Sequence, residues 1–231
     1  MSNTLTQEAM SSSQSQCTSR VMIVDDHALV RHGLTQLISG EPDLEVCAEA
    51  ATIDEAMEAL KADPDLIVVD ISLKEGSGIE LIKQIKAKDS EIKMLVSSMH
   101  DESLFAERAL HAGAKGYINK QESTENVLDA IRHVLDGHIY LSPKMTGRLL
   151  HGVVEGQRVP ETSSIEKLSD RELQVFERIG QGMSTRQIAN QLHLSIKTIE
   201  THREHIKSKL NLKNGAELSR HAVRWVLENA G

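Results

Sequence analysis

The sequence predicts an α/β domain with a doubly wound parallel sheet, followed by a second, all-α domain. Three observations predict this fold. Short apolar runs alternate with amphipathic stretches as far as Leu141, whereas only helical periodicity remains from Leu168 onward. Pro143, Pro160 and three glycines lie between these parts, where they favour a linker. The length of 231 residues is enough for two modest domains.

The apolar runs are the expected strands, and they fall at residues 21–24, 44–48, 66–69, 94–96 and 116–118. The central runs are rich in Val and Ile, as in strands that are buried on both faces. Apolar residues at helical spacing follow each run. They are Leu29, Leu34, Leu37 and Ile38; Ile53, Ala56, Met57 and Leu60; Ile79, Leu81, Ile82 and Ile85; Leu104, Ala109 and Leu110; and Val127, Ile131, Val134 and Leu135. Five strands alternating with five helices predict a parallel sheet covered on both faces.

The remaining segments complete the expected organisation. Residues 1–19 are rich in Ser, Thr and Gln, have no basic start and no apolar core, and are expected to be a disordered extension rather than a secretory signal. The α/β domain then spans residues 20–137, and the linker, with a short helix near residues 145–154, spans 138–163. The all-α domain takes residues 164–231.

Composition favours a cytoplasmic protein with two kinds of partner. No apolar run approaches the roughly 20 residues that a membrane helix needs, so we expect no membrane contact. The two cysteines, Cys17 and Cys47, do not form a disulfide scaffold and fit a reducing cytosol. Residues 164–231 carry a net charge of +3 and the rest of the chain −11, which favours different partners for the two halves. Because +3 is small, chance is the alternative, and charge alone does not indicate that the second half binds nucleic acid.

Polar residues stand at the ends of four predicted strands. Asp25 and Asp26 follow the first strand, Asp70 the third, Ser98 the fourth and Lys120 the fifth. Because the carboxyl ends of parallel strands meet at one edge, these groups should share a pocket. Three clustered carboxylates repel one another unless a cation joins them, and oxygen ligands suit Mg²⁺. One carboxylate could then attack a phosphoryl group, while the metal and the lysine neutralise its charge.

Taken singly, each of these residues also fits a helix cap, a turn or a solvated surface. Their joint placement at successive strand ends favours the pocket. The segments "VMIVDDH", "LIVVDISL", "MLVSSMHDE" and "GYINK" resemble the receiver domain of two-component response regulators over residues 20–137. This resemblance implies a five-stranded sheet of order 2-1-3-4-5 and a sensor histidine kinase as the phosphoryl donor.

The resemblance also implies a role for each residue of the pocket. Asp70 is the expected phosphoacceptor. The expected Mg²⁺ ligands are Asp25, Asp26, Asp70 and the backbone carbonyl of Ser72. The other expected roles are a switch hydroxyl at Ser98, a phosphoryl-contacting lysine at Lys120 and an aromatic that turns inward on activation at Tyr117. Ser97 competes with Ser98 for the switch role, but the Met-His-Asp-Glu that follows favours Ser98.

Two departures from the receiver pattern stand near the pocket. Leu73-Lys74-Glu75-Gly76 replaces the Met-Pro-Gly of many relatives, and Gln121 replaces a small residue or proline. The first is expected to loosen the loop, and the second to alter the docking surface or the geometry at Lys120. Neither removes a chemical group, so we expect the chain to accept a phosphoryl group.

The C-terminal part contains a helix-turn-helix pattern. Residues 185–192 form the expected first helix, a short turn follows, and Ser195 caps a longer helix at about residues 196–210. Ile199, Ile206 and Leu210 give this helix one buried stripe. Its polar face is either a solvated surface or the face that enters the major groove.

The segment "LSDRELQVFERIGQGMSTRQIANQLHLSIKTIETHREHIKSKLNL" resembles the LuxR-type helix-turn-helix of the NarL/FixJ group, which decides for the second interpretation. The resemblance implies four helices, transcriptional control and binding to DNA as a dimer. The candidate DNA contacts are Lys197, Thr198, Glu200, Thr201, His202, Arg203, Glu204 and Lys207. Lys197, Arg203 and Lys207 would neutralise phosphates, and Glu200, Thr201 and Glu204 would reach base edges. His202 matches the histidine that this family has in its recognition helix.

The last helix, at about residues 214–229, is expected to expose Leu218, Ala222 and Val226, and in relatives this helix often forms the dimer contact. Together the two resemblances favour a phosphorylation-gated transcription factor that is not an enzyme. Its expected partners are DNA, a sensor histidine kinase and a second copy of the chain when phosphorylated or on DNA.

Two other hypotheses stay open. An aspartyl-phosphate phosphatase would want a second Asp two positions after Asp70, where this chain has Ser72. A LuxR-type regulator could instead sense a small ligand or a partner protein through a degenerate receiver, although the intact acidic pocket and the scarcity of aromatics count against it. The eleven histidines include no HExxH motif or Cys/His array, so no transition-metal site is expected.

Overall fold

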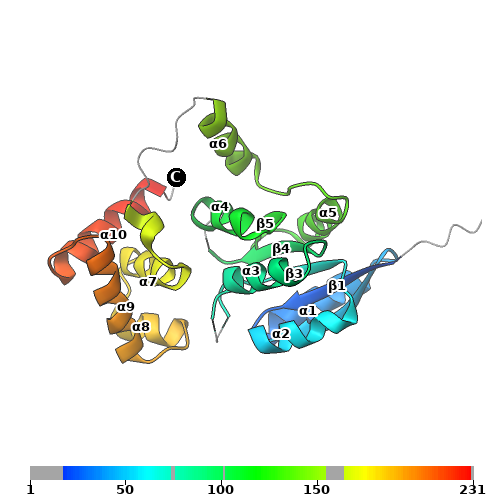
Figure 1. Ribbon diagram of the computed structural model, residues 1–231, viewed down its shortest axis with the longest axis horizontal. Coiled ribbons are helices and arrows are strands. Elements are labelled where there is room, and N and C mark those ends of the chain that lie inside the picture. Colours follow the sequence, from blue (N-terminus) through cyan, green and yellow to red (C-terminus); the bar gives the residue numbers. More distant parts are fainter. Residues whose placement is uncertain (1–17, 74–75, 101, 155–163, 230–231) are drawn as a thin grey trace, which may run out of the picture.

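The computed structural model describes residues 18–73, 76–100, 102–154 and 164–229 (Figure 1). Most of the expected N-terminal extension therefore lies outside the described residues, as do Lys74 and Glu75 of the altered loop. The part of the linker at residues 155–163 lies outside them too.

The first domain contains the predicted parallel sheet. Its strands are β1 (Ser19–Val24), β2 (Leu44–Ala50), β3 (Leu66–Val69), β4 (Lys93–Ser98) and β5 (Gly116–Asn119), in the order β2-β1-β3-β4-β5. The expected order is thus confirmed. The register pairs Val24 with Val69 and Val69 with Val96. The carboxyl ends of three central strands are therefore level, which sets the residues that follow them side by side.

Helices cover both faces of this sheet because successive side chains of each strand point to opposite faces. Val21 and Ile23 pack with α1 (Ala28–Ser39) and α5 (Thr124–Leu135). Met22 and Val24 pack on the other face, with α2 (Ile53–Ala59), α3 (Gly78–Lys88) and α4 (Glu102–Ala112). A short 3-10 helix, η1 (Leu60–Ala62), follows α2.

The chain stays with the first domain beyond residue 137. Tyr140 bridges to Gly116 of β5, and its carbonyl accepts a hydrogen bond from the Tyr117 N–H at 2.9 Å. Helix α6 (Pro143–Val154) follows, in the range where a short helix is expected. Pro143 suits its first position, and Ser142 Oγ accepts a hydrogen bond from the Met145 N–H.

Within residues 164–229, the second domain contains a short 3-10 helix, η2 (Ser164–Lys167), and the four predicted α-helices. These are α7 (Asp170–Gly180), α8 (Thr185–Gln191), α9 (Ile196–Lys209) and α10 (Gly215–Asn229). Ser169 and Ser184 begin α7 and α8 with capping boxes, and Ser195 caps α9 as expected. Burial raises the pKa of Glu172, but hydrogen bonds from Lys209 and Ser169 outweigh burial and hold this pKa below its usual value.

The expectation that the last helix exposes Leu218, Ala222 and Val226 is wrong at the first two residues, and Val226 is half-buried. Leu218 and Ala222 are fully buried rather than exposed, because they form the face of α10 that packs on α7. Gly180 permits this close packing, since a Cβ there would lie 2.5 Å from the Ala222 carbonyl oxygen. The exposed apolar residues of α10 are Val223 and Leu227.

The two domains lie side by side and share polar contacts (Figure 1). Arg108 of α4 donates hydrogen bonds to the carbonyls of Ile165 and Leu168 and to Asp170 Oδ1. Among the described residues, no helix combines the length and the hydropathy that crossing a bilayer requires.

Candidate functional site

The sheet brings the predicted acidic residues and the lysine to one edge. The level ends of β1 and β3 place Asp25, Asp26 and Asp70 together, and all three are buried. Lys120 Nζ lies 2.9 Å from Asp70 Oδ2 and also donates to Asp25 Oδ2. The Lys120 N–H donates to the Ser98 carbonyl, which fixes β5 beside β4 at the pocket.

The charges of this pocket influence one another. Burial raises the pKa of Asp70, and the nearby Asp25 raises it further, against the opposing effect of Lys120. Burial lowers the pKa of Lys120, but the charges of Asp70 and Asp25 outweigh burial and raise it. The pocket therefore keeps its lysine protonated.

The donor set fits a hard cation. Oxygens of Asp25, Asp26 and Asp70 and one nitrogen of His27 all lie within 4.8 Å of one another. Asp26 Oδ1 is buried and lies 2.6 Å from His27 Nδ1 in an ion pair. A buried set of ligands dominated by carboxylate oxygens suits Mg²⁺. The Ser72 N–H donates to Asp70 Oδ1 at 3.2 Å, while coordination by the Ser72 carbonyl stays a prediction.

The two expected switch residues converge on one loop residue, His100. Ser98 is fully buried, and its Oγ accepts a hydrogen bond from the His100 N–H. Tyr117 is also buried, lies inward, and donates its hydroxyl hydrogen bond to the His100 carbonyl at 2.9 Å. A movement of Ser98 or Tyr117 would therefore break a hydrogen bond to the His100 backbone.

Sequence reasoning assigned no role to His100. Its ring is 1% exposed and lies between the two domains. One ring nitrogen is 2.7 Å from Ser72 Oγ, and the other is 2.9 Å from Oε2 of Glu177 on α7. Gln174 of α7 also donates to Ser72 Oγ, at 3.5 Å. His100 thus connects the loop after Asp70 to the second domain.

Gly78 is a second residue that sequence reasoning missed. A Cβ at this position would lie 2.0 Å from the Asp70 carbonyl oxygen. The Gly78 N–H donates to the Ile71 carbonyl, and Ser77 caps α3 just before it. The absence of a side chain therefore allows α3 to begin directly beneath the candidate phosphoacceptor.

The second domain covers the pocket. A cavity of about 340 Å³ lies between the two domains. Residues of both domains line it, among them Asp26, Asp70 and Lys120 from the first and Arg171, Arg178 and His193 from the second. No sequence signal indicates these second-domain residues, because their position depends on how the domains pack.

The candidate DNA-binding residues lie on α9. Lys197, Glu200, Thr201 and Glu204 are exposed, whereas Thr198, His202, Arg203 and Lys207 are half-buried. Most of them line one open groove together with the N-terminal end of α10. The polar face of α9 is thus accessible, since four of these side chains are exposed.

Two of these candidates also serve the second domain itself. Thr198 bonds Ser195, the cap of α9, through both its N–H and its hydroxyl. His202 turns toward the packed side, and burial together with the charge of Arg171 lowers its pKa. Its Nδ1 atom is buried without a hydrogen-bond partner among the described residues.

Comparisons with known proteins match both domains. Residues 21–132 match the family "Response regulator receiver domain", and residues 166–222 match "Bacterial regulatory proteins, luxR family". Among curated proteins, the chain is 36% identical to the oxygen regulatory protein NreC of Staphylococcus epidermidis, covering 89% of this chain and 97% of that protein. NreC of Staphylococcus carnosus is also 36% identical over the same shares.

Solved structures of other proteins also match this chain. A LuxR-family two-component response regulator from Aurantimonas sp. SI85-9A1 is 36% identical with a TM-score of 0.55, covering 59% of this chain and 99% of that one. RcsB of Salmonella enterica serovar Typhimurium, bound to promoter rprA with a phosphomimetic, is 25% identical. Its TM-score is 0.57, and the match covers 89% of this chain and 98% of RcsB.

Proposed function

The chain belongs to the two-component response regulators that join a receiver domain to a LuxR-type DNA-binding domain, and we propose that it is controlled through phosphorylation of Asp70. The observation that carries this proposal is the convergence of Asp70, Asp25, Asp26 and Lys120 in one buried pocket. The role that we propose for each of the other three residues is based on its position relative to Asp70.

The family resolves the alternatives left open by the sequence. The chain is a transcriptional regulator of a two-component system, and its family is not one of enzymes, so the phosphatase hypothesis is set aside. The match to receivers over residues 21–132, with the acidic pocket intact, also counts against a ligand-sensing domain that merely resembles a receiver.

The chemistry at Asp70 is a transfer from a phosphohistidine of the kinase. A carboxylate oxygen of Asp70 attacks phosphorus, the P–N bond to the kinase imidazole breaks, and an aspartyl phosphate forms. Lys120, already 2.9 Å from Asp70, neutralises charge on the transferred group. Ser98 lies at the end of the neighbouring strand, where its hydroxyl can donate to a phosphoryl oxygen once it turns from its present partner.

Receiver domains bind Mg²⁺ at their phosphorylation site. In this chain Asp25, Asp26 and Asp70 would hold it, with the Ser72 carbonyl as a further ligand. Bound there, it would lower the pKa of Asp70 and neutralise charge on the phosphoryl oxygens.

We further propose that His100 carries the signal to the second domain. A phosphoryl group on Asp70 would draw Ser98 toward it, which removes the acceptor of the His100 N–H. The His100 ring would then lose its position between Ser72 and Glu177, and α7 would separate from the receiver. Separation exposes the covered pocket, so phosphorylation and domain contact oppose each other.

The DNA-binding step is assigned to α9. Its exposed Lys197, Glu200, Thr201 and Glu204 would face the major groove, with Arg203 and Lys207 beside them. Structures of the relative RcsB show it bound to promoters, and one shows two RcsB dimers on two DNAs. A dimer of this chain on DNA is therefore expected, and because its target is DNA we infer that it acts in the cytoplasm.

The modified residue can be identified directly. The full chain is incubated with an acyl-phosphate donor and Mg²⁺, and the products are analysed by intact and peptide mass spectrometry. We expect one phosphoryl group, at Asp70, that disappears in Asp70→Asn and when EDTA removes Mg²⁺. Phosphorylation at another residue, or none in the wild-type chain, would contradict the proposal.

A further inference from the structure

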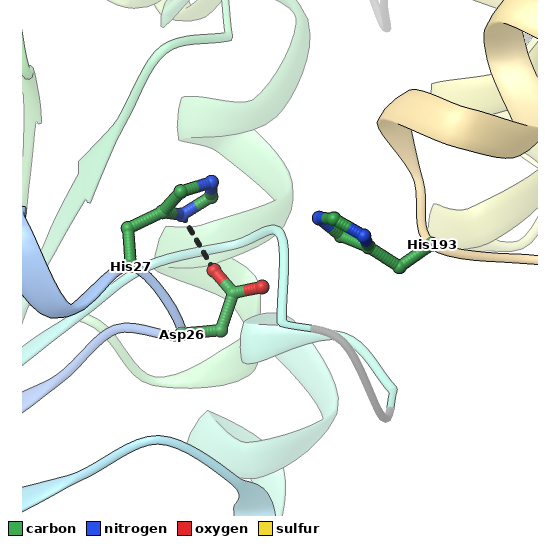
Figure 2. A group of neighbouring side chains, drawn as sticks. All are labelled: Asp26, His27 and His193. Carbon is green, nitrogen blue, oxygen red and sulfur yellow. Dashed lines mark ion pairs between the residues drawn. The ribbon is translucent and has the colours of Figure 1, made fainter.

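Two histidines far apart in the sequence meet at the edge of the phosphorylation pocket. His27 follows Asp26 at the end of β1, and His193 lies in the turn between α8 and α9. One ligand atom of each of these three residues lies within 4.8 Å of the other two. Figure 2 shows the His193 ring opposite the His27 ring and the Asp26 carboxylate, across the boundary between the domains.

We propose that Asp26, His27 and His193 bind a transition-metal ion that links the two domains. Two imidazoles and a carboxylate suit Zn²⁺ and similar divalent ions better than Mg²⁺. Three protein ligands leave the fourth tetrahedral position for water. The sequence shows no metal motif because the ligands come from separate domains, so only the packed chain reveals them.

The geometry needs little adjustment. A tetrahedral ion with bonds of about 2.0–2.1 Å holds its ligand atoms about 3.3 Å apart. His27 Nδ1 is 2.6 Å from Asp26 Oδ1, so the main movement needed is of the exposed His193 ring toward this pair. Asp26 Oδ1 is buried and already faces His27 Nδ1 in an ion pair, so these two atoms lie as neighbouring ligands would.

Such an ion would hold the second domain over the pocket. This consequence rests on the proposed phosphorylation of Asp70. Asp26 cannot serve the linking ion and Mg²⁺ fully at once, and a closed pocket keeps the phosphoryl donor from Asp70. By linkage, the bound ion opposes phosphorylation, and phosphorylation in turn weakens its binding.

The first experiment measures binding alone, by titration calorimetry of Zn²⁺ into the full chain. We expect one site in the wild-type protein and at least about tenfold weaker binding in His193→Asn and in His27→Asn. Asparagine tolerates the positive φ of 52° at position 193, so the fold is retained. His111→Asn, which changes an exposed histidine on α4, is the matched control and should bind like wild type. Equal affinity in all four proteins would overturn the proposal.

The second experiment measures the rate of Asp70 phosphorylation by an acyl-phosphate donor at constant Mg²⁺. For each protein, the rate with Zn²⁺ is divided by the rate without Zn²⁺. Zn²⁺ should slow the wild-type and His111→Asn proteins and leave His193→Asn unaffected. Equal slowing of all three would overturn the link between the domains. A wild-type chain that binds Zn²⁺ in the calorimeter but is never phosphorylated would contradict the proposed function and leave the metal site standing.

Discussion

Removing the Glu177 side chain should speed phosphorylation of Asp70, although Glu177 lies in the other domain. Its carboxylate is buried at the interface, 2.9 Å from His100 Nδ1. We call the form in which the second domain covers the pocket closed, and the form in which the domains are separated open. In Glu177→Ala the closed form would contain a buried His100 nitrogen without a partner, which raises the free energy of this form by about 1–3 kcal/mol. In the open form water satisfies the His100 nitrogen. The contacts of Glu177 with Gln181 and Arg178 lie within the second domain and are lost in both forms, so the difference between the two forms comes from His100.

This free energy corresponds to an open population about 5- to 150-fold larger, and the initial phosphorylation rate should rise by that factor until the open form dominates. An acyl-phosphate donor with Mg²⁺ avoids any effect on kinase docking, and phosphate-affinity gel electrophoresis gives the time course. Glu58→Ala removes the same charge from an exposed position on α2 and should leave the rate unchanged. A rate for Glu177→Ala equal to or below wild type would show that the contact between His100 and Glu177 does not hold the domains together.

Three further predictions concern the pocket, the second domain and DNA. Gly78→Ala places a Cβ against the Asp70 carbonyl, so it should lower the free energy of unfolding by about 1–3 kcal/mol in chemical denaturation and slow phosphorylation of Asp70. Gly33→Ala meets no atom within 4 Å, so it should raise the free energy of unfolding by about 0.5–1 kcal/mol. The pKa of Glu172 is lowered in the folded domain, so its contribution to stability is present above the unfolded pKa and is lost as pH falls through the folded pKa. Glu172→Gln should therefore lower the free energy of unfolding by about 1 kcal/mol at pH 7 and not change it at low pH. Unfolding can be followed by the fluorescence of Trp225, the single tryptophan, which packs on α7. An equal loss at both pH values would show that the charge of Glu172 does not stabilise the domain. Lys197→Ala should weaken binding to all DNA sequences alike and reduce the salt dependence by about one charge in fluorescence anisotropy, and an unchanged salt slope would remove Lys197 from the phosphate contacts.

The receiver fold and its pocket were predictable because both depend on local pattern. Each strand of four to seven residues is a short apolar run, and parallel pairing carries Asp70 and Lys120 to the same edge. The 2.9 Å contact between these two side chains follows from that topology. Only the family pattern assigns the switch role to Ser98 rather than to Ser97. Burial does not distinguish the two adjacent serines, because both are buried.

The contacts between the domains could not be predicted in this way. His100 and Glu177 are 77 positions apart, and their contact depends on how two separately patterned units pack. The error at Leu218 and Ala222 has a related cause. Helical periodicity identifies an apolar stripe but not what covers it, and here α7 covers the stripe that was assigned to a second copy of the chain.

Control of DNA binding by phosphorylation of Asp70 can be measured as equilibrium binding of the full chain to DNA, with and without phosphorylation. Target sites are first obtained by footprinting of genomic DNA, and affinity is then measured at fixed salt for wild type and Asp70→Asn. We expect tighter binding by the wild-type chain after treatment with donor and Mg²⁺, and no change in Asp70→Asn. Equal affinities for treated and untreated wild-type protein, or the same gain in both proteins, would contradict it.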